Sequence, residues 1–259
     1  MTKAKTTSKG RRGHPLILTV MRVKNEEAYL RYALESLRPL GGPVILLDDG
    51  STDTTPEIAK SFEFVEYIRQ DEATMDEGRD RTRLYRAALD WAPEWIFTLD
   101  GDEVLDPTTP ARMLRAIKKC PEHVNVFQMC IAIMASAPDA KKQKWYGPEE
   151  PVGAFVSRRL FRVSDAVEDS VIASDCPGNL HCGNIPEMRN RFSLNLNAWI
   201  KSYGYESSEA CARKLAFYEE HKFSRNVARM IALRAKTSPV VWADGASAPE
   251  MGKQNTVSY

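Results

Sequence analysis

Short apolar runs alternate with segments of helical periodicity over the first half of the chain. The apolar runs at residues 16–20, 44–47, 64–68 and 95–99 predict four strands. Helices are predicted from apolar spacing at residues 30–37 and 77–91, and from the N-cap threonines Thr55 and Thr109, each followed by proline. This alternation, with its short connections, predicts a mainly parallel, Rossmann-like α/β sheet flanked by helices.

The second half of the chain has a less regular pattern. Strands are predicted at residues 124–133 and 156–163, helices at residues 207–221 and 224–235, and loops at residues 141–153 and 166–186. Both ends of the chain are polar, so residues 1–13 and 241–259 are expected to be disordered tails. The remainder is expected to form one domain with two halves, residues 14–120 and an irregular residues 121–240.

Carboxylates directly follow two of the predicted strands. Asp48 and Asp49 end the second strand, and Asp100, Gly101 and Asp102 end the fourth. Parallel strands bring their carboxyl ends to one edge of a sheet, so the two clusters are expected to lie together. An extended backbone points Asp100 and Asp102 the same way, and Gly101 is expected to leave room for a ligand. Mg²⁺ or Mn²⁺ carrying a diphosphate is the natural occupant, although each cluster alone is equally well explained as a turn.

The composition narrows the possible functions. The chain has 259 residues, a formal net charge of +1 and five cysteines at irregular spacing. The balanced charge argues against a dedicated nucleic-acid binder, and the odd number of cysteines argues against a disulfide framework. No apolar stretch is long enough to span a membrane, and the first residues lack the apolar core of a signal peptide. We therefore expect a cytoplasmic protein without a specific nucleic-acid partner.

Four segments of the chain resemble the family 2 glycosyltransferases, which have the GT-A fold. The segments are VMRVKNEEAYLRYALESL, VILLDDGSTDTTPEIAKSF, DEGRDRTRLYRAALDWAPEWIFTLDGDE and, more weakly, WIKSYGYESSEACARKLAFYEEH. The resemblance implies an inverting enzyme that moves a sugar from a nucleotide diphosphate sugar, a UDP-sugar by preference, to an acceptor hydroxyl with Mn²⁺ or Mg²⁺. It also implies that residues 14–120 bind the nucleotide sugar and that residues 121–240 lie on the acceptor side.

The resemblance assigns roles to individual residues around the two carboxylate clusters. Asp49 is expected to hydrogen-bond the nucleotide base, in a pocket lined by the loop that contains Arg22 and Glu26. Asp102 is expected to bind the metal directly, and Asp100 is expected to lie nearer the ribose.

Other charged residues near these clusters have simpler expected roles. Arg79 is expected either to face the donor phosphates or to be an ordinary exposed helix arginine. Asp80 is expected to be a surface partner for the arginines around it, and Asp48 and Asp53 are expected to be loop and cap residues.

The remaining catalytic groups are predicted in the second half of the chain. The resemblance implies a third metal ligand from a late loop, and His181 in its glycine-flanked loop is the candidate. Related sequences often carry a histidine just before a Tyr-Gly-Tyr segment, where this chain has Ser202. Inverting transfer also needs a carboxylate base, for which Asp169 is the choice. The other candidates for this base are Glu149, Glu150, Asp165 and Glu168.

Two other functions remain open from the sequence. A sugar-nucleotide pyrophosphorylase has a related fold, but it usually opens with a glycine-rich phosphate loop, where residues 22–25 here are Arg-Val-Lys-Asn. A non-catalytic nucleotide-sugar-binding module of the same fold would bind the donor without transferring its sugar. The serine at position 202 keeps this second alternative open.

Overall fold

The structure is a computed structural model that describes residues 13–71, 76–134, 151–167 and 183–204, together with residues 216 and 256–257. Most of the predicted ligand and base residues of the second half fall outside these ranges. His181, Glu149, Glu150, Glu168 and Asp169 lie outside the described residues, whereas Asp165 lies inside them. The predicted helices at residues 207–221 and 224–235 also fall outside, apart from residue 216.

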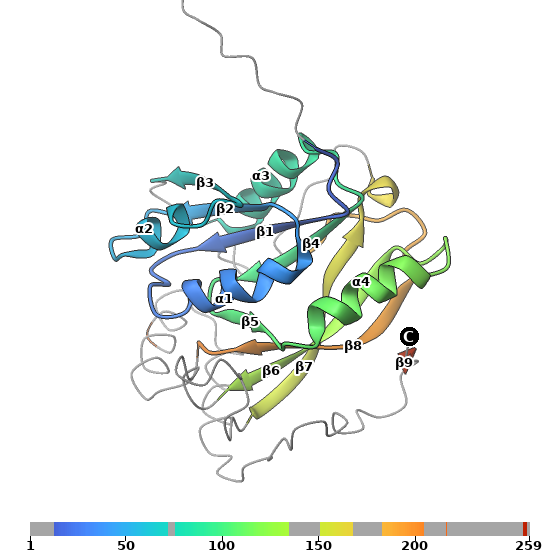
Figure 1. Ribbon diagram of the computed structural model, residues 1–259. Helices are drawn as coiled ribbons and strands as arrows, with labels where there is room; N and C mark the ends of the chain where they lie inside the picture. The colour runs from blue at the N-terminus through green and yellow to red at the C-terminus, as the bar shows by residue number, and fades with distance from the viewer. Residues whose placement is uncertain are drawn as a thin grey trace, which may run out of the picture.

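One sheet of nine strands forms the centre of the described structure (Figure 1). Four strands are parallel neighbours in the order β3-β2-β1-β4, namely β1 (Ile17–Val23), β2 (Val44–Asp49), β3 (Val65–Gln70) and β4 (Trp95–Asp100). The sheet continues from β4 in the order β7-β6-β8-β5, and β9 pairs with β8. These strands are β5 (Glu103–Leu105), β6 (Val126–Met134), β7 (Pro151–Arg162), β8 (Ser193–Ser202) and β9 (Thr256–Val257).

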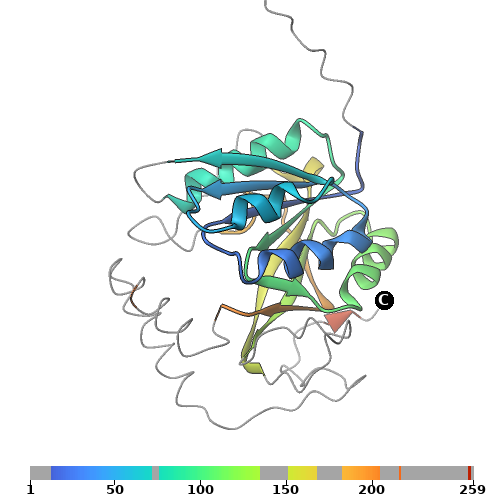
Figure 2. The same cartoon turned by 60° about the vertical axis from the view of Figure 1, so that its left-hand side comes forward.

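Helices cover both faces of this sheet (Figures 1 and 2). One face packs against α1 (Leu30–Leu37), α2 (Thr55–Lys60) and α4 (Thr109–Lys119). The other face packs against α3 (Glu77–Leu89). Side chains therefore alternate between two apolar cores along the central strands: Trp95 and Phe97 of β4 point to the first core, and Ile96 points to the second. Short 3₁₀ turns follow α1 and β7, at Arg38–Leu40 and Val163–Asp165.

The predicted mixed α/β architecture, with a mainly parallel sheet flanked by helices, is confirmed. Two local predictions were wrong, and two strands were missed. β7 begins at Pro151, inside the loop predicted at residues 141–153. β1 continues to Val23, so Arg22 lies on a strand and not in the loop after it. The short strand β5 and the long strand β8 were not predicted.

The two predicted threonine caps were also wrong. Thr55 Oγ1 accepts a hydrogen bond from the Glu26 amide instead of capping its own helix, and Thr109 Oγ1 bonds the backbone of Trp199. The carboxylates of Asp53 and Asp106 accept the amides at the starts of these helices. The threonines thus connect each helix start to a neighbouring element.

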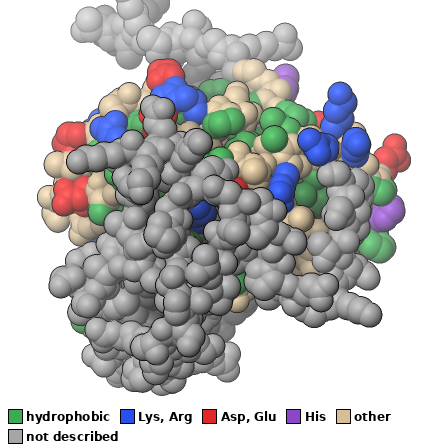
Figure 3. Space-filling model, turned by 60° about the horizontal axis from the view of Figure 1, so that its bottom comes forward, with side chains coloured by type: hydrophobic (Ala, Val, Ile, Leu, Met, Phe, Trp, Pro, Cys, Tyr) green, Lys and Arg blue, Asp and Glu red, His purple; other side chains and the backbone are tan. Residues whose placement is uncertain are grey.

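Among the described residues, no helix is long and apolar enough to cross a membrane. Both acidic and basic side chains lie on the described part of the face shown in Figure 3.

Candidate active site

The loops that follow β1 and β2 are joined by hydrogen bonds. The Asn25 amide donates to Ser51 Oγ at 2.8 Å, and Asn25 Oδ1 accepts from the Thr52 amide at 2.8 Å. The Glu26 amide donates to Thr55 Oγ1 at 2.7 Å. Asn25 has a φ of 55°, in the left-handed region that asparagine enters more readily than most residues. These bonds hold the two loops as one unit at the carboxyl edge of the sheet.

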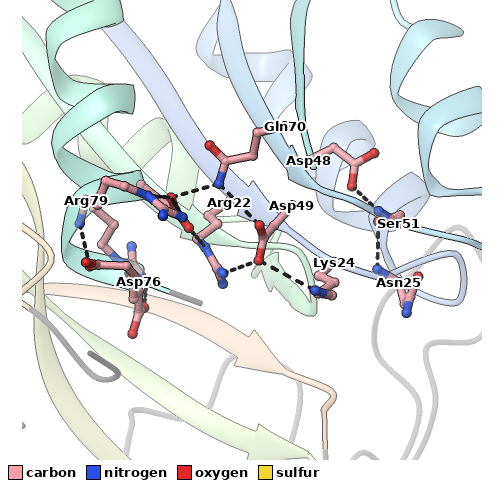
Figure 4. Close-up of polar contacts among 12 residues, drawn as sticks. Arg22, Lys24, Asn25, Asp48, Asp49, Ser51, Gln70, Asp76 and Arg79 are labelled. Atoms are coloured by element: carbon pink, nitrogen blue, oxygen red, sulfur yellow. Dashed lines mark hydrogen bonds and ion pairs between the residues drawn. The ribbon is translucent and has the colours of Figure 1, made fainter. Parts of the chain in front are cut away.

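Asp49, at the end of β2, accepts hydrogen bonds from two neighbouring strands (Figure 4). Its Oδ2 atom accepts from Arg22 Nη2 on β1 at 2.6 Å, and its Oδ1 atom accepts from Gln70 Nε2 on β3 at 3.2 Å. Lys24 Nζ lies 3.8 Å from Oδ2. A carboxylate offers about four lone-pair sites, so Asp49 retains acceptor capacity beside these contacts.

Asp80 of α3 extends the same network behind Asp49. Its carboxylate accepts from Arg22 Nε at 2.8 Å, from Gln70 Nε2 at 2.7 Å and twice from Arg79, at 2.9 and 2.8 Å. Burial opposes ionisation of Asp80, but the hydrogen bonds from Gln70, Arg22 and Arg79 outweigh it and lower its pKa. Asp80 does pair with a neighbouring arginine, but the prediction that it lies at the surface was wrong, because its side chain is completely buried.

Asp100, at the end of β4, lies between two arginines from distant parts of the chain. Its Oδ1 atom accepts from Arg81 Nη2 of α3 at 2.9 Å, and its Oδ2 atom accepts from Arg159 Nη1 of β7 at 3.3 Å. Burial again opposes ionisation, but Arg81 and Arg159 hold the pKa of Asp100 well below its usual range. Arg81 also donates to Glu77 Oε1 at 2.8 Å. Both oxygens of Asp100 are therefore already engaged by guanidinium groups.

Glu103 completes the turn after β4. Its Oε1 atom accepts from Arg159 Nη2 at 2.6 Å, and its Oε2 atom accepts from the Asp100 amide at 3.0 Å. Burial raises the pKa of Glu103 to about 7, and the charges of Asp100 and Asp102 add to the effect against the opposing pull of Arg159. The turn is thus rich in negative charge.

Gly101 and Asp102 are packed against other elements. A Cβ atom at Gly101 would lie 2.7 Å from Glu26 Cγ and 2.9 Å from Val23 Cγ1. The expectation that Gly101 leaves room for a ligand was therefore wrong, because the loop after β1 fills that space. Asp102 is largely buried, and its carbonyl accepts from the Tyr203 amide at 2.9 Å.

The sheet brings Ser202, the residue before the Tyr-Gly-Tyr segment, to this turn. β8 pairs antiparallel with β5, and Ser202 lies opposite Glu103 in the register. Opposed residues of an antiparallel pair project from the same face of the sheet. Ser202, at the position where related sequences often have histidine, therefore lies beside the carboxylate turn.

Comparison with known proteins places this geometry in a family. The sequence profile described as glycosyl transferase family 2 matches residues 19–179. The chain belongs to this family. The match includes both carboxylate clusters, α3 and β7. Together with the observed sheet, membership confirms the expected GT-A type of fold.

Several solved structures are similar to parts of this family 2 chain. TarS from S. aureus with UDP-GlcNAc is 19% identical, with a TM-score of 0.40 over 45% of this chain and 34% of that one. Another TarS structure is 14% identical, with a TM-score of 0.48 over 85% of this chain and 42% of that one. Glucosyl-3-phosphoglycerate synthase from Mycobacterium tuberculosis, with Mn²⁺ and UDP, is 20% identical, with a TM-score of 0.36 over 45% and 44%. The chain thus spans under half the length of the chain in each of these three structures. No curated protein sequence matches it.

The structure brings together most of the predicted donor-site residues of this family 2 chain. Arg22 contacts Asp49 directly, Glu26 packs on Gly101, and only β1 lies between the strands that carry Asp49 and Asp100. Asp53 is a cap residue, as predicted: its Oδ1 atom accepts from the Thr55 amide at 3.0 Å. The expectation that Asp48 lies in a loop was wrong, because Asp48 is a buried residue of β2, and its Oδ1 atom accepts from the Ser51 amide at 2.9 Å.

Three residues that contact the carboxylate clusters were not predicted, and the role of Arg79 is untested. The Arg79 side chain is 36% exposed and contacts Asp80, so its predicted role toward the phosphates stays a prediction. The α3 arginine on Asp100 is Arg81, which was not predicted; nor were Arg159 and Glu103. Because α3 carries several arginines, the sequence alone could not predict which of them contacts Asp100.

The donor set at the turn suits a hard divalent cation in this family 2 chain. Three carboxylates, those of Glu77, Asp100 and Glu103, pair with the guanidinium groups of Arg81 and Arg159, and Asp102 adds its charge beside Glu103. Carboxylate oxygens are the preferred ligands of Mg²⁺ and Mn²⁺, and the excess of negative charge favours a cation. Both oxygens of Asp100 are engaged by arginines, and the predicted ligand role of Asp102 stays a prediction. Within the described residues, no three His, Cys, Asp or Glu side chains form a metal-binding group.

Proposed function

We propose that this chain transfers a sugar from a nucleoside diphosphate sugar to an acceptor hydroxyl, with inversion and with a bound divalent cation. One observation supports this most: Asp49 on β2 and the Asp100–Asp102 turn on β4 end at the same sheet edge, on either side of Arg22 on β1. In open α/β sheets this edge is where nucleotides bind.

A uridine nucleotide is the donor that we propose first. The Asp49 carboxylate can accept only, so it suits a base with a ring N–H donor at its pairing edge, as in uracil. Guanine has a similar N–H, whereas unprotonated adenine and cytosine present a ring acceptor there. Arg22 and Gln70 hydrogen-bond the Asp49 carboxylate and fix its orientation, and Lys24 Nζ lies 3.8 Å from it.

The chain's own residues have separate tasks in the proposed reaction. Asp100, fixed by Arg81 and Arg159, orients the ribose side of the donor, and Asp102 holds the cation with His181 as the predicted further ligand. The cation, when bound, neutralises the diphosphate and makes it a better leaving group. Asp169 takes the proton from the acceptor hydroxyl. The acceptor oxygen then bonds to the anomeric carbon from the face opposite the departing nucleoside diphosphate.

The two halves of the chain divide the substrates in this proposal. Residues 14–120 hold the donor, and residues 121–240 supply the acceptor side, including His181 and Asp169.

One observation favours a second candidate function, binding of the nucleotide sugar without transfer. Ser202 stands opposite Glu103, where related sequences often have a histidine. A binding module would show stabilisation by nucleoside diphosphates without hydrolysis or transfer.

The proposal is tested by the metal dependence of nucleotide binding. We expect UDP to raise the melting temperature of the purified chain in Mn²⁺ and to do so much less after chelation. Asp102→Asn should abolish the difference between the two conditions. Asp106→Asn is the matched control, because Asp106 follows the same turn but caps α4, and it should retain the difference.

The result that would overturn the proposal is a wild-type chain that no nucleoside diphosphate stabilises with or without Mn²⁺. Release of UDP from a UDP-sugar then separates the two candidates: wild-type chain that binds UDP but releases none from any UDP-sugar supports the binding module.

A further inference from the structure

Arg159 reaches the carboxylate turn from a β-bulge in β7. Between Phe127 and Gln128 of β6, the paired residue in β7 changes from Leu160 to Arg158, so Arg159 is the extra residue of the bulge. Bulges re-aim a side chain locally and recur beside active sites. The Arg159 carbonyl accepts from Thr98 Oγ1 on β4 at 3.3 Å, which fixes the bulge against the strand that carries Asp100.

The Arg159 side chain is buried and bridges two carboxylates. It is 4% exposed, and its guanidinium contacts both Asp100 Oδ2 and Glu103 Oε1. Its Nε–H finds no acceptor within the described part of the chain. Burying a charge is costly unless it is paired, and a buried donor without an acceptor adds to that cost. An apolar side chain at this position would avoid the cost of burying a charge. The presence of arginine therefore suggests that its two-pronged contact with Asp100 and Glu103 has a role at the turn.

We propose that Arg159 is a positioning residue for the diphosphate end of the donor site. Its two Nη groups hold Asp100 and Glu103 on either side of the turn, and thereby set where the Asp102 carboxylate stands. The inference rests on the proposed donor-binding function. It assigns part of the donor site to β7, a strand of the proposed acceptor half.

The matched comparison is Arg159→Lys against Arg162→Lys. Both arginines lie on β7, and each has a buried Nε–H without an acceptor among the described residues. Arg162, however, donates to the Glu122 carbonyl and lies over the Trp95 ring, away from the carboxylate turn. Lysine keeps the charge in both variants and removes the two-pronged contact.

We expect Arg159→Lys to weaken UDP binding in Mn²⁺ by about 10- to 100-fold, the usual effect of losing a group that orients a metal ligand. Binding of uridine, which lacks the phosphates, should weaken much less than that of UDP, because the contacts of Asp49 are untouched and only the ribose contact proposed for Asp100 is disturbed. Arg162→Lys should leave both affinities near those of the wild type. Calorimetry measures UDP binding, ligand-observed NMR measures uridine binding, and melting temperatures confirm that the variants are folded.

Two results would overturn the inference, provided that the variant folds and the wild type binds UDP. The inference is overturned if Arg159→Lys binds UDP as the wild type does, or if uridine and UDP binding fall together, since that indicates a general loss of the site. If Arg159→Lys does not fold, Arg159→Gln is subject to the same comparison. If the wild type itself binds no UDP in Mn²⁺, the proposed function fails first, and this inference fails with it.

Discussion

Gly101→Ala is the sharpest test of how the carboxylate turn is packed. The added Cβ would lie 2.7 Å from Glu26 Cγ, 3.1 Å from Glu26 Cβ and 2.9 Å from Val23 Cγ1. The backbone of Gly101 is outside the left-handed region, so the cost is steric and not conformational. Val23 is on β1 and 1% exposed, which leaves it little freedom to move. The turn or the loop after β1 must therefore shift.

The magnitude follows from two opposing effects. Adding a methyl group to a packed site costs about 1–3 kcal/mol, and replacing glycine by alanine recovers roughly 0.4–1 kcal/mol by restricting the unfolded chain. We expect a net loss of about 1–2 kcal/mol in the free energy of unfolding, or about 2–8 °C in melting temperature for a chain of this size. UDP binding should weaken as well, because Asp100 and Asp102 flank the displaced residue.

Denaturant and thermal unfolding of matched variants measure this effect. Gly183→Ala is the control, because its Cβ would have its nearest contact at 3.6 Å from the Ile185 carbonyl, an ordinary distance. Glu26→Ala in the Gly101→Ala background should recover part of the lost stability by removing Cγ, while the Val23 contact persists. The reasoning is refuted if Gly101→Ala unfolds at the same temperature as Gly183→Ala, or if Glu26→Ala adds a full independent loss.

Two further substitutions test the neighbouring elements. Ser202→His should strengthen the Mn²⁺-dependent binding of UDP, because it adds an imidazole opposite Glu103; manganese titration followed by electron paramagnetic resonance measures it, and an unchanged affinity contradicts the proposed placement of the metal. Ser51→Ala should cost about 1–3 kcal/mol of unfolding free energy, because it removes the acceptor of the Asn25 amide, whereas the exposed Ser61→Ala should cost less than about 0.5 kcal/mol; equal losses in urea unfolding contradict the joined loops.

The sequence predicted the first four strands well because their signals are local. Each of the first four strands is a short apolar run, and two of them end in carboxylates. The rule that parallel strands share a carboxyl edge then places Asp49 near Asp100 without any knowledge of side-chain contacts. Residues whose place follows from the strand alone, such as Asp49, were therefore predictable.

The contacts that complete the site could not be predicted, because they are not local. Arg81 is one of several arginines on α3, and only the helix rotation brings it to Asp100. Arg159 depends on a bulge that no alternation of apolar and polar residues records. Strand β8 was missed because its buried and half-buried residues do not form a continuous apolar run. Ser202 reaches the turn because β8 pairs with β5, and this pairing could not be predicted without β8.

The charges along the sheet edge differ between the two ends of the proposed donor site. At the Asp49 end, Arg22 and Arg79 balance the carboxylates of Asp49 and Asp80, and this network is satisfied within the protein.

At the Asp100 end, the carboxylates of Glu77, Asp100 and Glu103 pair with two guanidinium groups, one of them that of Arg159 from β7, and Asp102 adds a further negative charge beside Glu103. A balanced network suits recognition of a neutral base, whereas a turn with excess negative charge repels a diphosphate unless a cation accompanies it. Metal dependence should therefore appear for ligands that contain the diphosphate and be absent for the nucleoside alone. That difference locates the cation at the Asp100–Asp102 turn more directly than loss of activity does.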